Sequence, residues 1–363
     1  MNILFLTYQG DIAGSTNSIS YLSRGLAERG HKVYMGCRKE ALLVTLLEGS
    51  GVEIIPMTFR GKMDRENIRH IAAVVREKEI DIVCPQSSYD RYTAGFAKWW
   101  YGLKAKNVHV RRQMPRSDGF FLVNWFIRKT ADKVVAVSEP IKAALMEAQG
   151  LPEKMMQVIH NGTPPEKYDL PDLEARSTEL RAKYAVDPSM PVIGCVSRLK
   201  QQEQIIRALA KVETPVQVFF VGIDKQEGWQ EIIDAYPVAH KLHFLGMVPS
   251  DKILYFYPLF DLKVLASDME GLSQSLLEAM AMSVPVIATA KAGNLDLIRD
   301  GENGLLFEDG NTDQLAHRIG LISRNPILRT SIVENGQKTA FNDYSIKKTI
   351  DNYESSFLKV IQC

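Results

Sequence analysis

The sequence predicts an α/β protein with two doubly wound, Rossmann-like domains that face each other across a cleft. Short β-branched or aliphatic runs alternate with longer helical patterns, as in parallel sheets covered by helices on both faces. The length of 363 residues, at roughly 150 per domain, suffices for two cores. A proline-rich stretch at residues 163–172 predicts a linker between them. Because open α/β sheets bind ligands at the carboxyl ends of their strands, we expect the site in the cleft.

The expected strands follow one another at regular intervals in both halves of the chain. The first half has strands at residues 3–8, 33–37, 52–56, 80–85, 107–112, 133–137 and 157–160. The second half has strands at residues 191–196, 216–221, 242–245, 262–266, 286–288 and 304–307, and the chain is expected to be helical from residue 312. These positions predict an N-terminal domain at 1–165, a C-terminal domain at 166–343 and a final helix, 344–363, that packs back on the N-terminal domain.

Composition argues against several classes of function. The 44 Lys and Arg residues against 43 Asp and Glu leave a net charge of +1, which gives no electrostatic footprint for nucleic acid. The four cysteines lack C-x-x-C spacing, so neither disulfides nor a thiolate metal site is expected. The first residues resemble a strand rather than a signal peptide, and no apolar run reaches the roughly 18 residues of a membrane span. We therefore expect a soluble, cytoplasmic protein.

The most informative segment is residues 265–286, which read L-A-S-D-M-E-G-L-S-Q-S-L-L-E-A-M-A-M-S-V-P-V. A strand is expected to end near Ala266 and a helix to begin near Ser273. The free amides and positive dipole end of such a helix make a site for phosphate. Glu270 precedes the helix and Glu278 lies on it, so the pair could reach opposite ends of a nucleotide. By itself, this spacing is more often a dipole-favoured residue plus a surface residue.

Several motifs together resemble a known family. The run E-G-L-S-Q-S-L-L-E-A-M-A, followed by V-P-V-I-A-T and A-G-N-L-D-L-I-R-D-G-E-N-G-L-L-F, closely resembles the C-terminal signature of retaining glycosyltransferase family 4, which has the GT-B fold. Residues 136–142, 158–162, 244–249 and 344–346 also fall in the family's order and spacing. The resemblance covers nearly the whole chain. It implies that the C-terminal domain binds a nucleotide-sugar and the N-terminal domain an acceptor.

The resemblance also implies roles for individual residues. In the family, the second glutamate of E-x7-E binds the ribose hydroxyls, and the first lies beside the donor sugar and its phosphates. These roles fall to Glu278 and Glu270. Backbone amides at the helix start would hold a phosphate, and the turn after the strand at 242–245 would frame the base. The expected donor-binding residues are Glu278, Gly271, Leu272, Ser273, Gln274, Gly246, Met247 and Gly14.

The chain departs from the family at the diphosphate. Arg198 matches the arginine of the family's G-R-L turn, but Glu203 stands where a lysine is usual, and the nearest lysine is Lys200. A carboxylate facing a diphosphate would repel it by on the order of 1–4 kcal/mol. Either Lys200 takes over, with Glu203 at the solvated start of the next helix, or Arg198 and amides suffice, or catalysis is lost. We expect Glu270, Arg198 and Lys200 to be the catalytic residues.

The N-terminal half follows the family less closely. The family's glycine-rich first loop is represented by Gly14 with Ser15, without an adjacent glycine pair. His109 alternates with apolar residues, which favours a place inside the sheet over one beside the acceptor. Arg111 and Arg112, at the end of the same strand, are better placed to meet an anionic group. Ser15, His109, Arg111 and Arg112 are the acceptor-side candidates.

Residues 91–133 carry a charge signal of their own. This segment has ten Lys and Arg residues against two Asp residues, a local net charge of +8, and aromatic residues such as Trp99, Trp100 and Trp125 lie between them. Basic and aromatic residues on helices suit an anionic membrane surface, where each cation contributes about 1 kcal/mol. The alternative is that the aromatics face the core and the cations form a solvated rim. Lipid-linked acceptors are common in the family, which favours a peripheral position on the cytoplasmic face of the membrane.

The resemblance implies a retaining glycosyltransferase that moves a sugar from a nucleotide diphosphate to a hydroxyl. The acceptor would be a glycan, a lipid-linked molecule or a lipopolysaccharide. The base is not readable from the residues, and a UDP-sugar is the donor that we expect first. Front-face displacement needs no cofactor or metal, and no Asp-x-Asp occurs in the sequence. Two alternatives remain: a sugar-nucleotide epimerase of similar architecture, and a non-catalytic protein that binds a sugar-nucleotide or a membrane.

Overall fold

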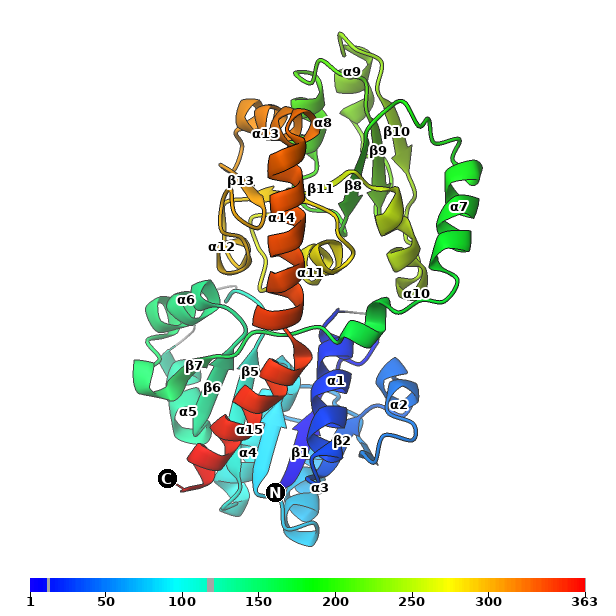
Figure 1. Ribbon diagram of the computed structural model, residues 1–363. Helices are drawn as coiled ribbons and strands as arrows, with labels where there is room; N and C mark the ends of the chain where they lie inside the picture. The colour runs from blue at the N-terminus through cyan, green and yellow to red at the C-terminus, as the bar shows by residue number, and fades with distance from the viewer. Residues whose placement is uncertain (12–13, 116–120, 363) are drawn as a thin grey trace. The chain divides into compact units, whose positions relative to one another are not determined.

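The computed structural model describes residues 1–11, 14–115 and 121–362 (Figure 1). The chain divides into two compact units. The first comprises Met1–Gly162 together with Ser345–Cys363, and the second comprises Thr163–Tyr344. Each unit is a parallel sheet with helices on both faces, so the predicted α/β class is confirmed.

The first unit is built on a seven-stranded parallel sheet with the order β3-β2-β1-β4-β5-β6-β7. Its strands are β1 (Asn2–Leu6), β2 (Lys32–Cys37), β3 (Glu53–Pro56), β4 (Ile82–Pro85), β5 (Lys106–Arg111), β6 (Lys133–Ala136) and β7 (Met156–Val158). Its helices are α1 (Gly14–Glu28), α2 (Leu42–Leu46), α3 (Arg65–Glu77), α4 (Ser88–Tyr101), α5 (Phe121–Thr130), α6 (Glu139–Gln149), the short η1 (Glu153–Met155) and α15 (Ile346–Gln362).

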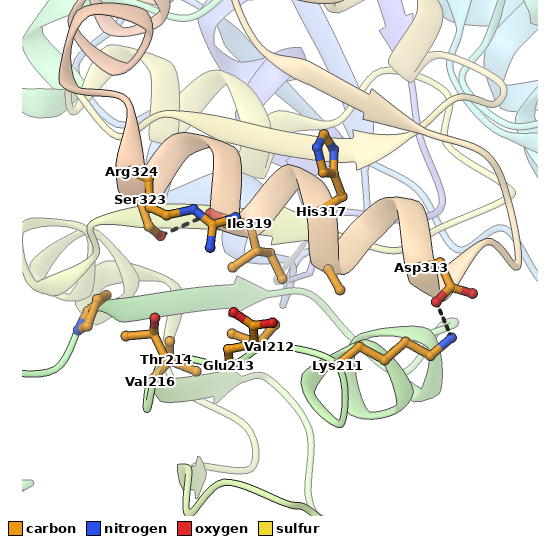
Figure 2. A pocket seen from close by; sticks show the side chains of 13 residues that line it. Lys211, Val212, Glu213, Thr214, Val216, Asp313, His317, Ile319, Ser323 and Arg324 are labelled. Carbon is orange, nitrogen blue, oxygen red and sulfur yellow. Dashed lines mark hydrogen bonds and ion pairs between the residues drawn. The ribbon is translucent and has the colours of Figure 1, made fainter.

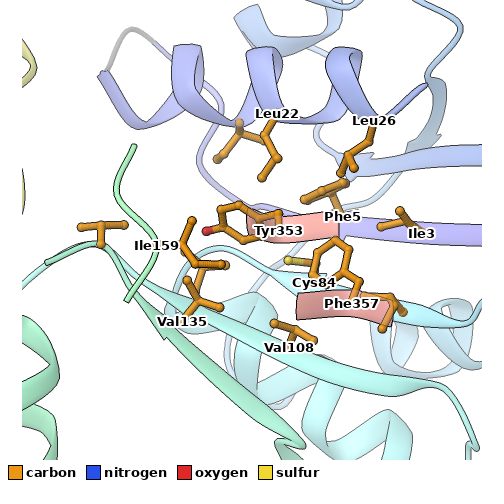
Figure 3. Close-up of a cluster of buried hydrophobic side chains, with 14 of the residues drawn as sticks. Ile3, Phe5, Leu22, Leu26, Cys84, Val108, Val135, Ile159, Tyr353 and Phe357 are labelled. Carbon is orange, nitrogen blue, oxygen red and sulfur yellow. The ribbon is translucent and has the colours of Figure 1, made fainter. Parts of the chain in front are cut away.

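Strand β1 shows why this sheet is covered on both sides. Its run N-I-L-F-L is apolar at every position after the first, and alternate residues enter different cores. Ile3 and Phe5 belong to the cluster that includes residues of α1 and α15, which Figure 3 shows around Tyr353 and Phe357. Leu4 belongs to the opposite cluster, with residues of α3 and α4. Helix α15 therefore completes the core of the first unit although it ends the chain.

The second unit is built on a six-stranded parallel sheet with the order β10-β9-β8-β11-β12-β13. Its strands are β8 (Val192–Val196), β9 (Gln217–Val221), β10 (Lys241–Phe244), β11 (Leu262–Leu265), β12 (Val286–Thr289) and β13 (Leu305–Phe307). Its helices are η2 (Pro165–Tyr168), α7 (Leu173–Lys183), α8 (Glu203–Leu209), α9 (Trp229–Asp234), α10 (Ser250–Ile253), η3 (Leu254–Leu259), α11 (Gln274–Ala281), α12 (Asn294–Leu297), α13 (Thr312–Arg324), α14 (Pro326–Lys338) and η4 (Thr339–Asp343).

The strand order of the second sheet reverses direction between β8 and β11, its two central strands. This is the topological switch point, where loops after neighbouring strands run to opposite faces and leave room for a ligand. The loops that follow β8 and β11 carry the charged residues singled out in the sequence. The sheet order therefore brings two segments, about 70 positions apart in the chain, to one edge.

The expected secondary structure is largely confirmed. The described residues contain all thirteen expected strands, each with ends within two residues of the expected position, and the helical tail. The stretch 163–172, predicted to be an inter-domain linker, contains local structure of its own. Pro165–Tyr168 forms a 3-10 turn, and the amide of Thr163 donates to the Tyr344 carbonyl within the second unit at 2.9 Å. Two adjacent prolines fix the backbone dihedral angles for such a turn, so this stretch adds structure to the second unit.

Candidate donor site in the second unit

The loop after β8 is held by one buried amide side chain. Gln202 is fully buried, and its Nε2 donates to Ser197 Oγ at 2.7 Å and to the Arg198 carbonyl at 2.8 Å. Its Oε1 accepts from the Lys200 amide at 2.6 Å. These three bonds fix the loop that carries the two candidate cations. The Arg198 side chain is exposed, and that of Lys200 is half-buried.

Lys200 and Glu270 form the ion pair at the centre of this edge. The Lys200 ammonium contacts the Glu270 carboxylate and donates to Ser267 Oγ at 3.2 Å. The Glu270 side chain is 15% exposed and that of Lys200 25%, so the pair is largely shielded from water. Two of the three expected catalytic residues, Lys200 and Glu270, are therefore in direct contact, whereas the third, Arg198, is exposed on the loop after β8.

Two glycines let the loops after β11 and β12 approach each other. The Gly293 amide donates to the Glu270 carbonyl at 3.0 Å. A Cβ atom on Gly293 would lie only 1.8 Å from the Gly271 carbonyl oxygen. The backbone of Glu270 and Gly271 is therefore supported from behind by a segment that tolerates no side chain at this point.

Helix α11 starts directly after this loop. Ser273 is its N-cap, with its Oγ accepting from the Leu276 amide at 3.4 Å. The amides at the helix start have no intrahelical acceptors, so they can bind an anion. Gln274 Nε2 is buried and has no hydrogen-bond partner among the described residues. Leu272 is buried beneath these polar groups.

The second glutamate of the motif is held by two partners. Glu278 Oε1 accepts from Lys167 Nζ at 2.6 Å, and its Oε2 accepts from the Tyr257 hydroxyl at 2.9 Å. Burial, together with the neighbouring Glu278 carboxylate, raises the pKa of Tyr257 well above its usual value, so its hydroxyl stays protonated as a donor. The Glu278 side chain is 16% exposed, which leaves part of the carboxylate accessible to a ligand.

The turn expected to frame the base is tied to the turn after β9. Gly246 has a φ of +58°, and a Cβ there would meet Asp224 Oδ1 at 2.9 Å. Its amide donates to the Ile223 carbonyl at 3.0 Å, and its carbonyl accepts from the Gly222 amide at 2.9 Å. Met247 is 75% exposed, so its side chain is available at the surface.

Glu203 pairs with Arg207 rather than with Lys200. It is the first residue of α8, it is exposed, and its carboxylate pairs with Arg207 one turn later at 2.6 Å. A carboxylate at the positive end of a helix is favourable. Of the three alternatives for the missing family lysine, this arrangement favours the one in which Lys200 provides the cation.

The candidates of the first unit lie on two segments, the start of α1 and the end of β5. Gly14, a donor-side candidate, is exposed at the start of α1, and Ser15, an acceptor-side candidate, follows it. His109 is buried in β5, as expected, and burial together with Arg91 and Arg111 lowers its pKa well below 6.5, so the ring is neutral. Neither of its ring nitrogens has a partner among the described residues.

The two strand-end arginines, both expected to meet an anionic group, differ in their hydrogen-bond partners. Arg111 is buried, and its guanidinium donates to Gln149 Oε1 at 3.1 Å. Burial lowers its pKa to about 9. Arg112 bonds Gln86 but leaves Nε and one terminal nitrogen without partners among the described residues. Both of these Arg112 nitrogens are buried.

The basic and aromatic segment 91–133 is divided between core and surface. Phe126 is buried, whereas Trp99, Trp100 and Trp125 are 55%, 46% and 40% exposed. The Trp99 and Trp125 rings meet edge to face, with centroids 5.7 Å apart, across α4 and α5. Lys98 pairs with Asp132, while Lys104, Arg128 and Lys129 are exposed. Residues 116–120 of this segment lie outside the described residues.

The chain matches two family models that together span both units. Residues 12–167 match the model of Glycosyltransferase Family 4, and residues 176–339 match the model of Glycosyl transferases group 1. The chain belongs to glycosyltransferase family 4. Its fold is the GT-B fold: the structure of the Anabaena protein HepE in complex with UDP is similar, with a TM-score of 0.82 and 22% identity, over 99% of this chain and 100% of that one.

Two curated relatives of this family 4 member have names that state a role. This chain is 25% identical over 240 residues to the N-acetyl-alpha-D-glucosaminyl L-malate synthase of Bacillus anthracis, a match that covers 64% of this chain and 61% of that protein. It is 27% identical over 177 residues to a lipopolysaccharide core biosynthesis glycosyltransferase of Rhizobium meliloti, covering 48% of this chain and 51% of that protein. The chain therefore spans less than two thirds of the length of these relatives.

The sequence pattern does not single out Lys167 and Tyr257, the two partners of Glu278, or Lys263, which is buried on β11 and donates to Ser275 Oγ at 3.0 Å. Lys167 lies in the segment taken for a linker, and Tyr257 lies in an aromatic run that reads as core. Lys263 could have been noticed, because a lysine inside the apolar strand L-K-V-L breaks its pattern. The other two become visible only when the chain folds.

Further structural features bear on other kinds of site. A cavity of about 250 Å³, lined by residues such as Lys211, His317 and Arg324, lies beside the amino ends of β8 and β9 and contains none of the candidate residues (Figure 2).

Among residues 1–11, 14–115 and 121–362, no group of three or more His, Cys, Asp or Glu side chains is placed to hold a metal. In the same part of the chain, no helix is both long and apolar enough to cross a membrane.

Proposed function

We propose that this chain is a retaining glycosyltransferase that moves a sugar from a UDP-sugar to a hydroxyl of a glycan, lipid-linked or lipopolysaccharide acceptor. The observation that carries the proposal is the contact between Lys200 and Glu270 directly ahead of the α11 N-terminus, with Glu278 farther along that helix. Cations, free amides and a second carboxylate are thereby assembled within one unit. A UDP complex of the similar HepE structure supports the choice of base.

The proposed chemistry needs little from the protein beyond charge and position. The bond from the sugar to the diphosphate breaks while the acceptor hydroxyl attacks from the same face, and a diphosphate oxygen takes the hydroxyl proton. Arg198, Lys200 and the amides of residues 272–274 would stabilise the negative charge that develops on the leaving group. Glu270 would orient the donor sugar, and Glu278 the ribose. In this scheme no metal or other cofactor is required.

A binding screen tests the donor site. We would measure thermal shifts with UDP, GDP, ADP, CMP and TDP for the wild type, for Glu278→Ala and for Glu334→Ala. Glu334 is exposed on α14 and serves as the matched control. One nucleotide at 100 times its Kd should add about 2.7 kcal/mol of stability to the wild type and the control, and far less to Glu278→Ala. No shift with any nucleotide would contradict the proposed donor site.

Product analysis separates transfer from the two alternatives. With the donor sugar and candidate acceptors, a glycosyltransferase should form a new glycoside, whose anomeric configuration NMR would show to match the donor. An epimerase would change the sugar without an acceptor. A binding protein would show the thermal shift but leave the donor intact.

We propose further that the exposed tryptophans Trp99, Trp100 and Trp125 place the first unit on an anionic membrane. They lie next to one another on α4 and α5, with Lys104 and Lys129 exposed nearby in the chain. Indole rings favour the interface between water and lipid, and the cations add attraction to anionic headgroups. A lipid-linked acceptor would then be within reach of the acceptor-binding unit.

Co-sedimentation with phosphatidylglycerol vesicles tests this surface. Wild-type protein should sediment at low salt, and replacing the three tryptophans by serine should abolish this. Lys104→Glu with Lys129→Glu should weaken sedimentation strongly. Exchanging Ile327, an exposed apolar residue of the second unit, for serine should change nothing. Sedimentation that survives the tryptophan changes would contradict the proposal.

A further inference from the structure

Strand β11 carries a lysine at a position that faces the apolar layer. Leu262 and Val264 enter the cluster that includes residues of α8 and α13, whereas Leu265 enters the cluster that includes residues of α11. Lys263 lies between Leu262 and Val264 in the strand, so its side chain points to the opposite face of the sheet, the face that α11 covers. Its side chain is completely buried. A lysine is almost never fully buried unless it is paired, so this position needs an explanation.

The ammonium has one hydrogen-bond acceptor among the described residues, the side chain of Ser275. Lys263 Nζ donates to Ser275 Oγ at 3.0 Å. Ser275 Oγ is in turn 3.3 Å from the Oγ of Ser273, the N-cap of α11. The Ser275 carbonyl accepts from the Tyr257 hydroxyl at 3.0 Å. Lys263 therefore supports the first turn of α11, from which the proposed phosphate-binding amides project.

Charged groups surround this lysine from several elements. Cys195 on β8, Glu278 on α11 and Glu270 in the preceding loop favour its charged form, and Lys200 opposes it. Burial outweighs the favourable groups and lowers the pKa of Lys263 to about 8. The two carboxylates already pair with Lys200 and Lys167, so little of their charge is left to balance a third cation.

We propose that Lys263 is a positioning residue of the donor site, a buried ammonium beneath the first turn of α11 whose charge is balanced by the diphosphate of the bound donor. This proposal rests on the proposed function, because it assumes a nucleoside diphosphate at this helix end. The lysine acts through Ser275 and through its charge and need not touch the ligand. An anion above the turn should favour the protonated lysine, since opposite charges stabilise each other strongly at a site with little water.

The sign of the pH dependence follows from this coupling. Below pH 8 the lysine of the free protein is already charged, so affinity for the diphosphate is at its maximum. Above pH 8 the neutral amine prevails, and binding must be accompanied by proton uptake. Each further pH unit then weakens binding by up to tenfold, until the higher pKa of the complex is reached. Between pH 7.5 and 9.0, affinity should fall about eightfold.

Calorimetric titration with UDP tests the proposal. For the wild type, Kd at pH 7.5, 8.0, 8.5 and 9.0 should rise as described, and buffers of different ionisation enthalpy should reveal proton uptake near pH 8.5. The Lys263→Met variant should bind UDP about tenfold more weakly than the wild type at pH 7.5. Its Kd should not rise between pH 7.5 and 9.0 in the way that the wild-type Kd does. Lys263→Arg, which keeps a charge at every pH tested, should also lack the pH-dependent loss. Lys252→Met, at an exposed lysine of the same unit, is the matched control and should behave as the wild type.

The outcomes separate this inference from the proposed function. If the wild type binds no nucleoside diphosphate at any pH, the proposed function fails. If it binds UDP with constant Kd and no proton uptake, or if Lys263→Met retains the full pH dependence, the role of Lys263 is overturned. The wild-type measurements decide this even if a variant does not fold, and Ser275→Ala offers a milder change that should reduce affinity while leaving the lysine in place.

Discussion

Glu203 shows how a single substitution at a family position can be absorbed by its surroundings. The carboxylate stands at the start of α8, pairs with Arg207 and is exposed to water. Lys200, three residues earlier, makes the contact with Glu270 that places a cation at the site. The charge needed by a diphosphate is therefore available from another position on the same loop.

Exchanging Glu203→Lys should have little effect. We expect the Kd for UDP to change less than threefold and the free energy of unfolding to fall by less than about 1 kcal/mol, because one exposed ion pair and one favourable dipole contact are lost. Titration calorimetry and urea denaturation would measure both. Lys200→Met, the comparison variant, should weaken UDP binding at least tenfold. Donor binding that becomes ten times tighter in Glu203→Lys would show instead that the glutamate opposes the diphosphate.

At the scale of elements, the proposed donor site depends on loops whose backbones meet without side chains between them. The turns after β11 and β12 approach until the backbone of Gly293 touches that of Gly271. The turns after β9 and β10 are joined in a similar way by Gly222 and Gly246. These contacts hold carbonyl and amide groups of the two pairs of turns at hydrogen-bond distance.

Gly293→Ala should therefore damage the site. Its backbone conformation, with φ of −64°, accepts alanine, so the effect comes only from the new methyl group, 1.8 Å from the Gly271 oxygen. Displacing the Glu270 loop should weaken UDP binding by at least tenfold and lower the free energy of unfolding by about 1–3 kcal/mol. Gly61→Ala is the control, because a Cβ there meets nothing within 4 Å. Unchanged affinity in Gly293→Ala would mean that the loop can move without loss of function.

At the scale of the whole molecule, each unit has its own hydrophobic clusters. Those of the first unit include Tyr353 and Phe357 from the last helix of the chain (Figure 3). Those of the second unit consist of residues within Thr163–Tyr344, the unit that carries the proposed donor site. A substitution that destabilises the core of one unit should therefore leave ligand binding by the other unit intact.

Phe357→Ala tests this division. The ring is fully buried, so its removal should cost about 3–5 kcal/mol of stability in the first unit. The Kd for UDP should stay within twofold of the wild type at a temperature where the protein remains folded. Leu358→Ala, at a position that is 45% exposed, should change neither property. Loss of UDP binding in folded Phe357→Ala would contradict a donor site confined to the second unit.

The fold was predictable because its causes are local and periodic. Apolar strands such as 2–6, alternating with helical patterns, specify buried parallel strands wherever they occur, so the α/β class and every expected strand are confirmed. The motif around Glu270 and Glu278 identified the family for the same reason: it is one continuous segment. Sequence thus determined the class of fold, the family and the segment that carries the donor-site candidates.

Only the tertiary structure decided which groups meet. Lys167 reaches Glu278 across 111 positions, and Lys200 reaches Glu270 across 70. Arg111 and Arg112 are neighbours in sequence, yet the first donates to Gln149 and the second has two buried nitrogens without a partner among the residues that the structure describes. The charge state and surroundings of such groups depend on burial and on partners brought in by sheet order. Periodicity along the chain carries no information about either, because both arise from contacts between distant segments.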